Sequence, residues 1–196
     1  RRAVESLVKA ATPLLDGNYT SSSLDALRKA IERAQEVIEN SDRGEDEISE
    51  AYTAIVDAIF NLQMKGNKAA LKAMIDKAQE ILQASDSYVA STIQGLSAAM
   101  ANAKSVYNNE EATQSQVDKA VETLTKQVAL ARLVGDVNGD GAVSTADGTA
   151  LLQYTAEMQD LNDAAKESAD VNGDGVTDTK DAVLVLQYAS EKIATF

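Results

Sequence analysis

The sequence contains no cysteine and no histidine, and these two absences exclude several kinds of site at once. Without cysteine there is no disulfide and no thiolate metal site. Without histidine, the commonest general base and the commonest transition-metal ligand are both missing. Tryptophan is absent too, aromatic residues make up only 4% of the chain, and proline occurs once. Good helix formers such as Ala, Leu, Gln, Glu and Lys dominate instead, so we expect an all-α protein packed through small residues.

The acidic residues are concentrated towards the C-terminus. Residues 135–196 carry 12 acidic and 3 basic side chains, against 19 and 15 in residues 1–134. An acidic surface repels nucleic-acid phosphates and anionic lipids, so we expect neither nucleic acid nor membrane insertion. No apolar run approaches the roughly 18 residues of a membrane span. The acid-rich end suggests a cation as ligand, and the abrupt start at Arg1 inside helical sequence suggests an excised fragment.

The first 134 residues contain an internal repeat. Residues 24–62 and 93–131 match at a fixed offset of 69. In each copy apolar residues recur every three or four positions, the spacing of helices that bury one face. This spacing predicts three helices per copy, near 3–15, 21–40 and 45–64 and near 69–84, 90–107 and 113–133.

Local signals fix the expected helix ends. Thr20 and Thr113 are plausible N-caps. Pro13 should end or bend the first helix around Thr12. Gly66, between the copies, marks either a break or a weak spot in one long shared helix.

The two copies resemble a known module. The run YTSSSLDALRKAIERAQEVI with ISEAYTAIVDAI, and SYVASTIQGLSAAMANAKSVY with TQSQVDKAVETLTKQV, are similar to the FIVAR module of secreted bacterial proteins. The resemblance implies two consecutive three-helix bundles, which we place at residues 1–65 and 66–134.

Two similar acidic loops follow, DVNGDGAVSTAD at 136–147 and DVNGDGVTDTKD at 170–181. Their spacing is that of an EF-hand calcium loop with Asp in place of Glu at position 12. One copy could be a solvated turn, but two in register favour calcium, and magnesium fits less well because it resists full dehydration. The expected ligands, with position 7 acting through its backbone oxygen, are Asp136, Asn138, Asp140, Ala142, Ser144 and Asp147, and Asp170, Asn172, Asp174, Val176, Asp178 and Asp181. The second loop offers four carboxylates against three, so we expect it to bind Ca²⁺ more tightly.

Each loop precedes a helical LQY segment, while residues 160–169 read as a short connector. A loop with one exiting helix, duplicated about 34 residues apart, resembles a dockerin over residues 135–194, and we place this domain at 135–196. The resemblance implies two Ca²⁺ ions and calcium-dependent binding to a cohesin module, which attaches secreted glycoside hydrolases to a scaffold or to each other.

The dockerin resemblance also assigns positions to partner binding. They are Thr145, Ala146, Leu152 and Gln153 in the first repeat and Thr179, Lys180, Leu186 and Gln187 in the second. The Ser-Thr pair and the basic pair familiar in the family are absent, which predicts a more apolar contact. Core packing is an equal alternative for Leu152 and Leu186, and Tyr154 and Tyr188 fit a core better.

Three functions follow from these patterns. The leading interpretation is a non-catalytic, extracellular docking module in which the helical bundles act as a spacer. The alternative is a surface adhesin whose bundles bind a host protein or glycan, although the tyrosines of the bundles, including Tyr52, fall at repeat or core positions. An enzyme is disfavoured, because the acidic pairs near Glu45–Glu47 and at Glu110 and Glu111 read as solvated loops.

Overall fold

The computed structural model covers residues 1–196, and its secondary structure consists of helices with three isolated β-bridges. The contacts divide the chain into two compact units, residues 1–71 with 105–120 and residues 72–104 with 121–196. Three helices have residues in both units: α4 (Ala69–Gln83), α6 (Leu96–Asn108) and α7 (Gln114–Leu130). None of the helices is long and apolar enough to cross a membrane.

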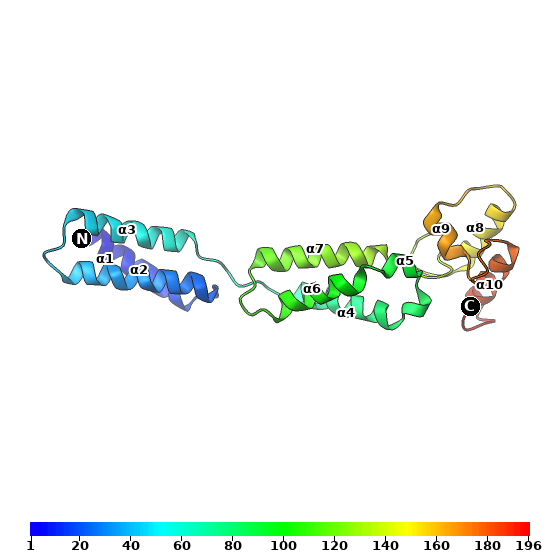
Figure 1. Ribbon diagram of the computed structural model, residues 1–196, viewed down its shortest axis with the longest axis horizontal. Helices are drawn as coiled ribbons and strands as arrows, with labels where there is room; N and C mark the ends of the chain where they lie inside the picture. Colours follow the sequence, from blue (N-terminus) through cyan, green and yellow to red (C-terminus); the bar gives the residue numbers. More distant parts are fainter. The chain divides into compact units, whose positions relative to one another are not determined.

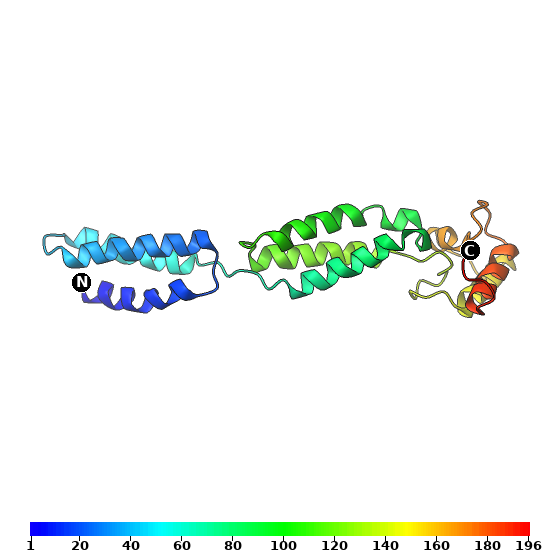
Figure 2. The same cartoon turned by 90° about the horizontal axis from the view of Figure 1, so that it is seen from below.

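The first bundle consists of α1 (Arg2–Ala11), α2 (Ser21–Glu39) and α3 (Glu45–Phe60), which lie side by side (Figures 1 and 2). Their apolar faces meet in one core, as the three- and four-residue spacing predicts. Its buried members are Val4, Ala11, Leu27, Ala30, Ile31, Ala34, Val37, Ala51, Ile55 and Ala58. Half of these are alanines, which lets the helix backbones approach closely with few large side chains.

The predicted helix ends are largely confirmed. Helix α1 ends at Ala11, and Pro13 lies in the short 3₁₀ turn that follows, where its missing N–H costs no helical hydrogen bond. Thr113 caps α7, because its hydroxyl accepts from the Gln116 amide while the Gln116 side chain accepts from the Thr113 amide. Thr20 occupies the N-cap of α2, but its hydroxyl donates to the Ser23 hydroxyl rather than capping an amide.

The second copy of the repeat differs from the expectation at one helix. The predicted helix over 90–107 is interrupted, with α5 (Ala90–Ile93) separated from α6 by Gln94 and Gly95. Gly95 lies against the Gln127 side chain, and a β-carbon on it would collide with the Gln127 carboxamide. Between the copies α3 ends at Phe60 and α4 starts at Ala69, so the region around Gly66 is a break and not a shared helix.

The C-terminal domain contains α8 (Thr145–Thr155), α9 (Asp163–Ala169) and α10 (Thr179–Ala189), with α8 packed against α10. Its buried apolar residues are Val137, Leu151, Leu161, Ala165, Ala169, Val171, Ala182 and Val185. The prediction of a simple connector over 160–169 was wrong. Asn162 caps a helix there, because its side-chain oxygen accepts the Ala165 amide at 2.8 Å.

Candidate functional site

The first acidic loop is wound around the carboxylate of Asp136, which is buried. Its Oδ1 accepts the amides of Gly139 (2.8 Å) and Asp140 (3.1 Å), and its Oδ2 accepts the amide of Gly141 (3.0 Å). Gly141 has a φ of 91°, a left-handed conformation that residues with a β-carbon rarely adopt. The backbone therefore turns at position 6, as the motif requires.

Position 12 ties the two ends of this loop together. The Asp147 carboxylate is fully buried and accepts the amides of Val137 (2.9 Å) and Asn138 (3.0 Å) through Oδ1. Its Oδ2 accepts both the amide (2.8 Å) and the hydroxyl (3.1 Å) of Ser144, the N-cap of α8. Asp147 thus couples the start of the loop to the first turn of the exiting helix.

The second loop repeats this arrangement around Asp170. Its two oxygens accept the amides of Asp174 (3.1 Å) and Gly175 (2.9 Å). Gly175 has a φ of 82°, matching Gly141. The Asn172 side-chain oxygen accepts the Asp174 amide at 2.8 Å, and the Asp174 carboxylate accepts the Val176 amide at 2.9 Å, so the side chains at positions 1, 3 and 5 all accept amides of the loop backbone.

Position 12 of the second loop is Asp181, which is fully buried like Asp147. It accepts the amides of Val171 (3.1 Å), Asn172 (3.3 Å) and Asp178 (2.9 Å). Here Asp178 replaces the serine of the first loop, so no hydroxyl occupies the remaining acceptor site of Asp181. The two loops therefore share a backbone conformation. Their predicted side-chain ligands differ at one position, position 9.

The donor chemistry of both loops fits a hard cation. The predicted ligands are all oxygens, and the buried carboxylates of Asp136, Asp147 and Asp181 accept from amides and form none of the ion pairs of this domain. No three acidic side chains are clustered closely enough to hold a metal ion, and the carboxylates of Asp136, Asp147 and Asp181 accept backbone amides. A carboxylate has about four acceptor sites, so most of these groups keep capacity for a further ligand.

The number of occupied acceptor sites on the position-12 carboxylate differs between the two loops. Asp147 uses all four of its acceptor sites, one of them for the rotatable Ser144 hydroxyl, whereas Asp181 uses three. The second loop also has a nearby cation, because the Lys180 ammonium lies 3.6 Å from Asp178 and 3.9 Å from Asp174. That ammonium is 73% exposed, so water and salt screen it strongly.

The positions assigned to partner binding lie on the outer sides of α8 and α10. In the first repeat Thr145, Ala146 and Gln153 are exposed, and so is Leu152, at 40%. In the second repeat the exposed positions are Thr179, Lys180 and Gln187.

Leu186 is the exception among these eight positions. It is only partly exposed and packs on α8, where a β-carbon at Gly148 would lie 2.5 Å from its Cδ2 atom. Leu152 and Leu186 thus differ: the first is a surface residue and the second fills the contact between the helices. Tyr154 and Tyr188 are both half-buried; Tyr154 packs against the buried core, in keeping with its assignment, whereas Tyr188 stacks on Phe196.

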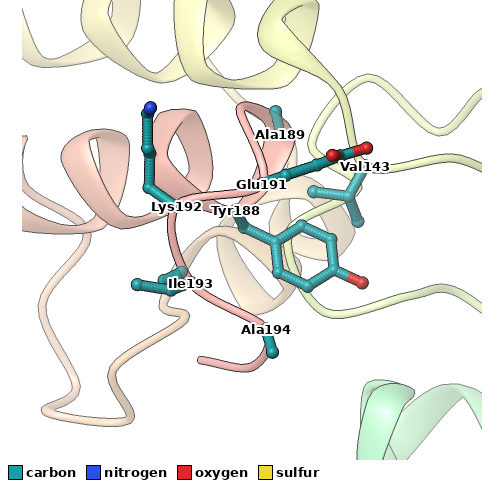
Figure 3. Close-up of a pocket in the computed structure, with 7 residues that line it drawn as sticks. All are labelled: Val143, Tyr188, Ala189, Glu191, Lys192, Ile193 and Ala194. Carbon is teal, nitrogen blue, oxygen red and sulfur yellow. The ribbon is translucent and has the colours of Figure 1, made fainter.

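A hollow of about 620 Å³ lies at the C-terminal end of α10. Figure 3 shows the Tyr188 ring beside Val143, with Ile193 and Ala194 of the terminal segment along the lower side. The Tyr188 ring also stacks on Phe196, with ring centroids 4.7 Å apart. No predicted calcium ligand or partner-binding residue lines this hollow, so it lies outside the candidate site.

Glu47 and Glu111, which belong to the acidic pairs of the bundles, lack the pKa of a glycosidase acid. A glycosidase needs a carboxylic acid with a raised pKa beside a second carboxylate. The hydrogen bond from Lys65, with two from Ser21, lowers the pKa of Glu111 to about 2. The hydrogen bond from Arg43 likewise lowers the pKa of Glu47. Neither group therefore has the raised pKa that the acid of a glycosidase requires.

Two residues that the spacing did not reveal support the first loop. The Arg132 guanidinium donates to the backbone oxygens of Asp136 (2.8 Å) and Val137 (2.5 Å). The buried Ser168 hydroxyl donates to the same Asp136 oxygen at 2.8 Å. Neither residue belongs to the twelve-residue motif, so no pattern in the sequence marks them.

Comparison with known families agrees with this geometry. A model of the FIVAR domain matches residues 5–63 and again residues 67–129, and a model of the dockerin type I domain matches residues 134–189. No solved structure matches the chain. Dockerin type I domains bind calcium and cohesin modules, and neither domain type is catalytic. The chain therefore belongs to the FIVAR family, with two FIVAR domains in tandem followed by a dockerin type I domain.

Proposed function

We propose that residues 135–196 fold around two Ca²⁺ ions, one in each acidic loop, and dock on a cohesin module. The observation that carries this proposal is the duplicated loop with a buried position-12 carboxylate, Asp147 or Asp181. A buried carboxylate without a cationic partner is costly, and a bound cation offsets that cost. Calcium binding would therefore supply part of the folding free energy of this domain.

Each loop would hold its ion through the same six positions. Side-chain oxygens at positions 1, 3, 5, 9 and 12 and the backbone oxygen at position 7 make up the donor set. These residues are Asp136, Asn138, Asp140, Ala142, Ser144 and Asp147, and Asp170, Asn172, Asp174, Val176, Asp178 and Asp181. When bound, the ion supplies the positive charge that holds the loop closed. The extra carboxylate of Asp178 and the spare acceptor site on Asp181 support tighter binding in the second loop.

The cohesin would contact the exposed sides of α8 and α10. Leu152 supplies an apolar anchor in the first repeat, next to the uncharged Thr145, Ala146 and Gln153. The second repeat contributes Thr179, Lys180 and Gln187, while Leu186 supports this surface from below by packing on Gly148.

The wider role we propose is attachment of a secreted glycoside hydrolase, or another carbohydrate-active protein, to a scaffold or partner enzyme in a cellulosome-like assembly. In this role the chain is extracellular, and the cohesin belongs to a secreted or cell-surface protein. The FIVAR domains, with boundaries proposed at 1–65 and 66–134, act as a spacer. The dockerin match supports this role, since cohesin binding is what that domain type does.

Calcium titration tests the metal assignment directly. Calorimetry on the chelator-treated chain should give two sites, and Asp140→Ala with Asp174→Ala should abolish both. Asp163→Ala removes an exposed carboxylate of α9 outside the loops and should leave both sites intact. Two sites of unchanged affinity in the double variant would refute the ligand assignment.

The docking role is tested by affinity capture. The immobilised chain is exposed in calcium to secreted and surface proteins of its source, and bound protein is eluted with chelator. A cohesin-bearing protein in the eluate supports the proposal, and the same double variant should fail to capture it. Retained nanomolar binding by that variant would contradict calcium-dependent docking.

One observation favours the adhesin alternative. Three residues at four-residue intervals form an exposed apolar stripe on α3: Tyr52 at 42%, Val56 at 41% and Phe60 at 87% exposure. The sequence-based assignment of Tyr52 to a repeat or core position was therefore incomplete. If the bundles bind a host protein or glycan, residues 1–134 alone should bind it, and Phe60→Ser should weaken that binding.

A further inference from the structure

Both FIVAR domains close with the same backbone clip. In the first, Tyr19 forms an antiparallel bridge with Met64, and in the second Tyr88 forms one with Leu133. Both members of the second pair lie 69 residues after those of the first, which is the offset of the sequence repeat. The clip joins the segment that enters the second helix to the segment that leaves the domain.

The hydrogen bonds of the clip recur with the same offset. In the first domain the Thr20 amide donates to the Gln63 carbonyl at 2.8 Å. In the second the Val89 amide donates to the Arg132 carbonyl, also at 2.8 Å. A further bond extends it: the Lys65 amide donates to the Asn18 carbonyl at 3.0 Å, and the Val134 amide donates to the Ser87 carbonyl at 2.9 Å. The clip, which ends at Lys65 or Val134, thus recurs in both FIVAR domains of this chain and positions the next residue in the same way.

That next residue is a glycine in both copies, and its amide bonds to the module that follows. Gly66 donates to the carbonyl of Ala112, in the loop between α6 and α7, at 2.8 Å. Gly135 donates to the carbonyl of Ser168, in α9 of the dockerin, at 2.7 Å. Although one following module is a FIVAR domain and the other a dockerin, both offer a carbonyl to the equivalent glycine.

A glutamate stands directly before Ala112 and another directly before Ser168. The side chain of each contacts the start of the second helix of the preceding domain. Glu111 accepts hydrogen bonds from the Ser21 amide and hydroxyl, the latter at 2.9 Å, and pairs with Lys65 at 2.9 Å. Glu167 accepts a hydrogen bond from the Ser91 hydroxyl. Ser91 stands one position later in the repeat than Ser21, where the second copy has an alanine.

We propose that these contacts form a common joint, in which a glutamate and the carbonyl after it dock on the clip of the preceding FIVAR domain. By this joint the dockerin docks on the second FIVAR domain through Glu167 and Ser168, in the same manner as Glu111 and Ala112 dock on the first. The partner of this FIVAR surface is therefore the next module of the chain, whichever type it is.

The dockerin joint has contacts that extend into the first calcium loop. Arg132, at the clip, donates to the backbone oxygen of Asp136, and so does the Ser168 hydroxyl. Gln63, at the position equivalent to Arg132, has no such loop to bind. The joint therefore fixes the FIVAR domain to the loop backbone without using a predicted ligand side chain.

The test measures the distance distribution across the joint in the full chain. The chain has no cysteine, so two introduced cysteines are labelled uniquely. Spin labels at Thr125→Cys on α7 and Ser190→Cys after α10 report on the second FIVAR domain and the dockerin. With calcium present and the dockerin folded, we expect one narrow distance distribution. Glu167→Ala should at least double its width, and Ser91→Ala should do the same.

Matched variants show whether a broader distance distribution comes from loss of the contact between Ser91 and Glu167. Asp163→Ala removes another exposed carboxylate from α9 and should leave the width unchanged. The double variant Ser91→Ala with Glu167→Ala should be no wider than either single variant, because the two side chains act on each other. A broad distribution in the unmodified chain, or a width unaffected by Glu167→Ala, overturns the joint. Circular dichroism on the same samples shows that the dockerin is folded, so failure of the joint is distinguishable from failure of the calcium assignment.

Discussion

Replacing Gly148 by alanine tests the packing of α8 on α10. Within a helix this substitution alone should stabilise by about 1 kcal/mol, because alanine is the better helix former. Here the new β-carbon would lie 2.5 Å from Cδ2 and 2.6 Å from Cγ of Leu186. Overpacking of this kind costs about 1–3 kcal/mol, since Cγ moves only if the whole side chain or the helix shifts. We therefore expect a net loss of about 1 kcal/mol.

The assay is thermal unfolding of the dockerin domain at one fixed, saturating calcium concentration, because bound ligand raises the apparent stability. For a domain of this size a loss of about 1 kcal/mol lowers Tm by roughly 4–8 °C. Thr149→Ala, at the next and exposed position of α8, should change stability by about 0.5 kcal/mol or less.

The decisive comparison is a double-mutant cycle with Leu186→Ala. In that background the clash is gone, so Gly148→Ala should become stabilising by about 1 kcal/mol through helix propensity alone. The sign of the effect thus depends on residue 186. If Gly148→Ala has the same effect in both backgrounds, or raises Tm in the unmodified chain, the close approach of Leu186 to α8 is refuted.

Chelation of calcium should unfold residues 135–196 while leaving the FIVAR helices intact, which far-ultraviolet circular dichroism and limited proteolysis would detect. Glu157→Gly should raise the free energy of unfolding by about 1 kcal/mol in denaturant titrations, because Glu157 has a φ of 59°. Ile55→Ala, in the core of the first bundle, should cost about 2–5 kcal/mol in the same assay. The folded pKa of Glu111, about 2, lies below its ordinary value of 4.5. Its hydrogen bonds with Ser21 and Lys65 should therefore stabilise the fold fully above pH 4.5 and be lost as pH falls through about 2, which an NMR titration of its carboxylate would follow.

The helices of the FIVAR domains could be predicted because their apolar spacing is regular and their ends carry local signals. Thr113 and Pro13 act within a few residues of themselves, so the sequence around each was sufficient. The break at Gly95 was missed because the apolar spacing of Val89, Ile93, Leu96 and Ala99 continues across it without interruption. The connector over 160–169 hid a short helix, since seven residues are too few to show a periodic pattern.

In the candidate site, too, the local features could be predicted from the sequence and the contacts between distant residues could not. The twelve-residue spacing located two loops that wind around Asp136 and Asp170 and run into the first turns of α8 and α10, because the motif is local. The difference between Leu152 and Leu186 depends on what each faces on the neighbouring helix, which the repeat itself does not reveal. Arg132 and Ser168 reach the loop from outside it, and no spacing rule connects them to it.

The position of the clip has a consequence for how such chains can vary in length. Because the clip ends one residue before Gly66 and again one residue before Gly135, excision of residues 66–134 would place Lys65 directly before Gly135. The shortened chain would keep an intact clip and a glycine amide ahead of the dockerin, with Gln63 in place of Arg132 and Lys65 in place of Val134, which packs against the dockerin core. Copy number can thus change by whole 69-residue steps, through duplication or deletion, without any new linker having to evolve.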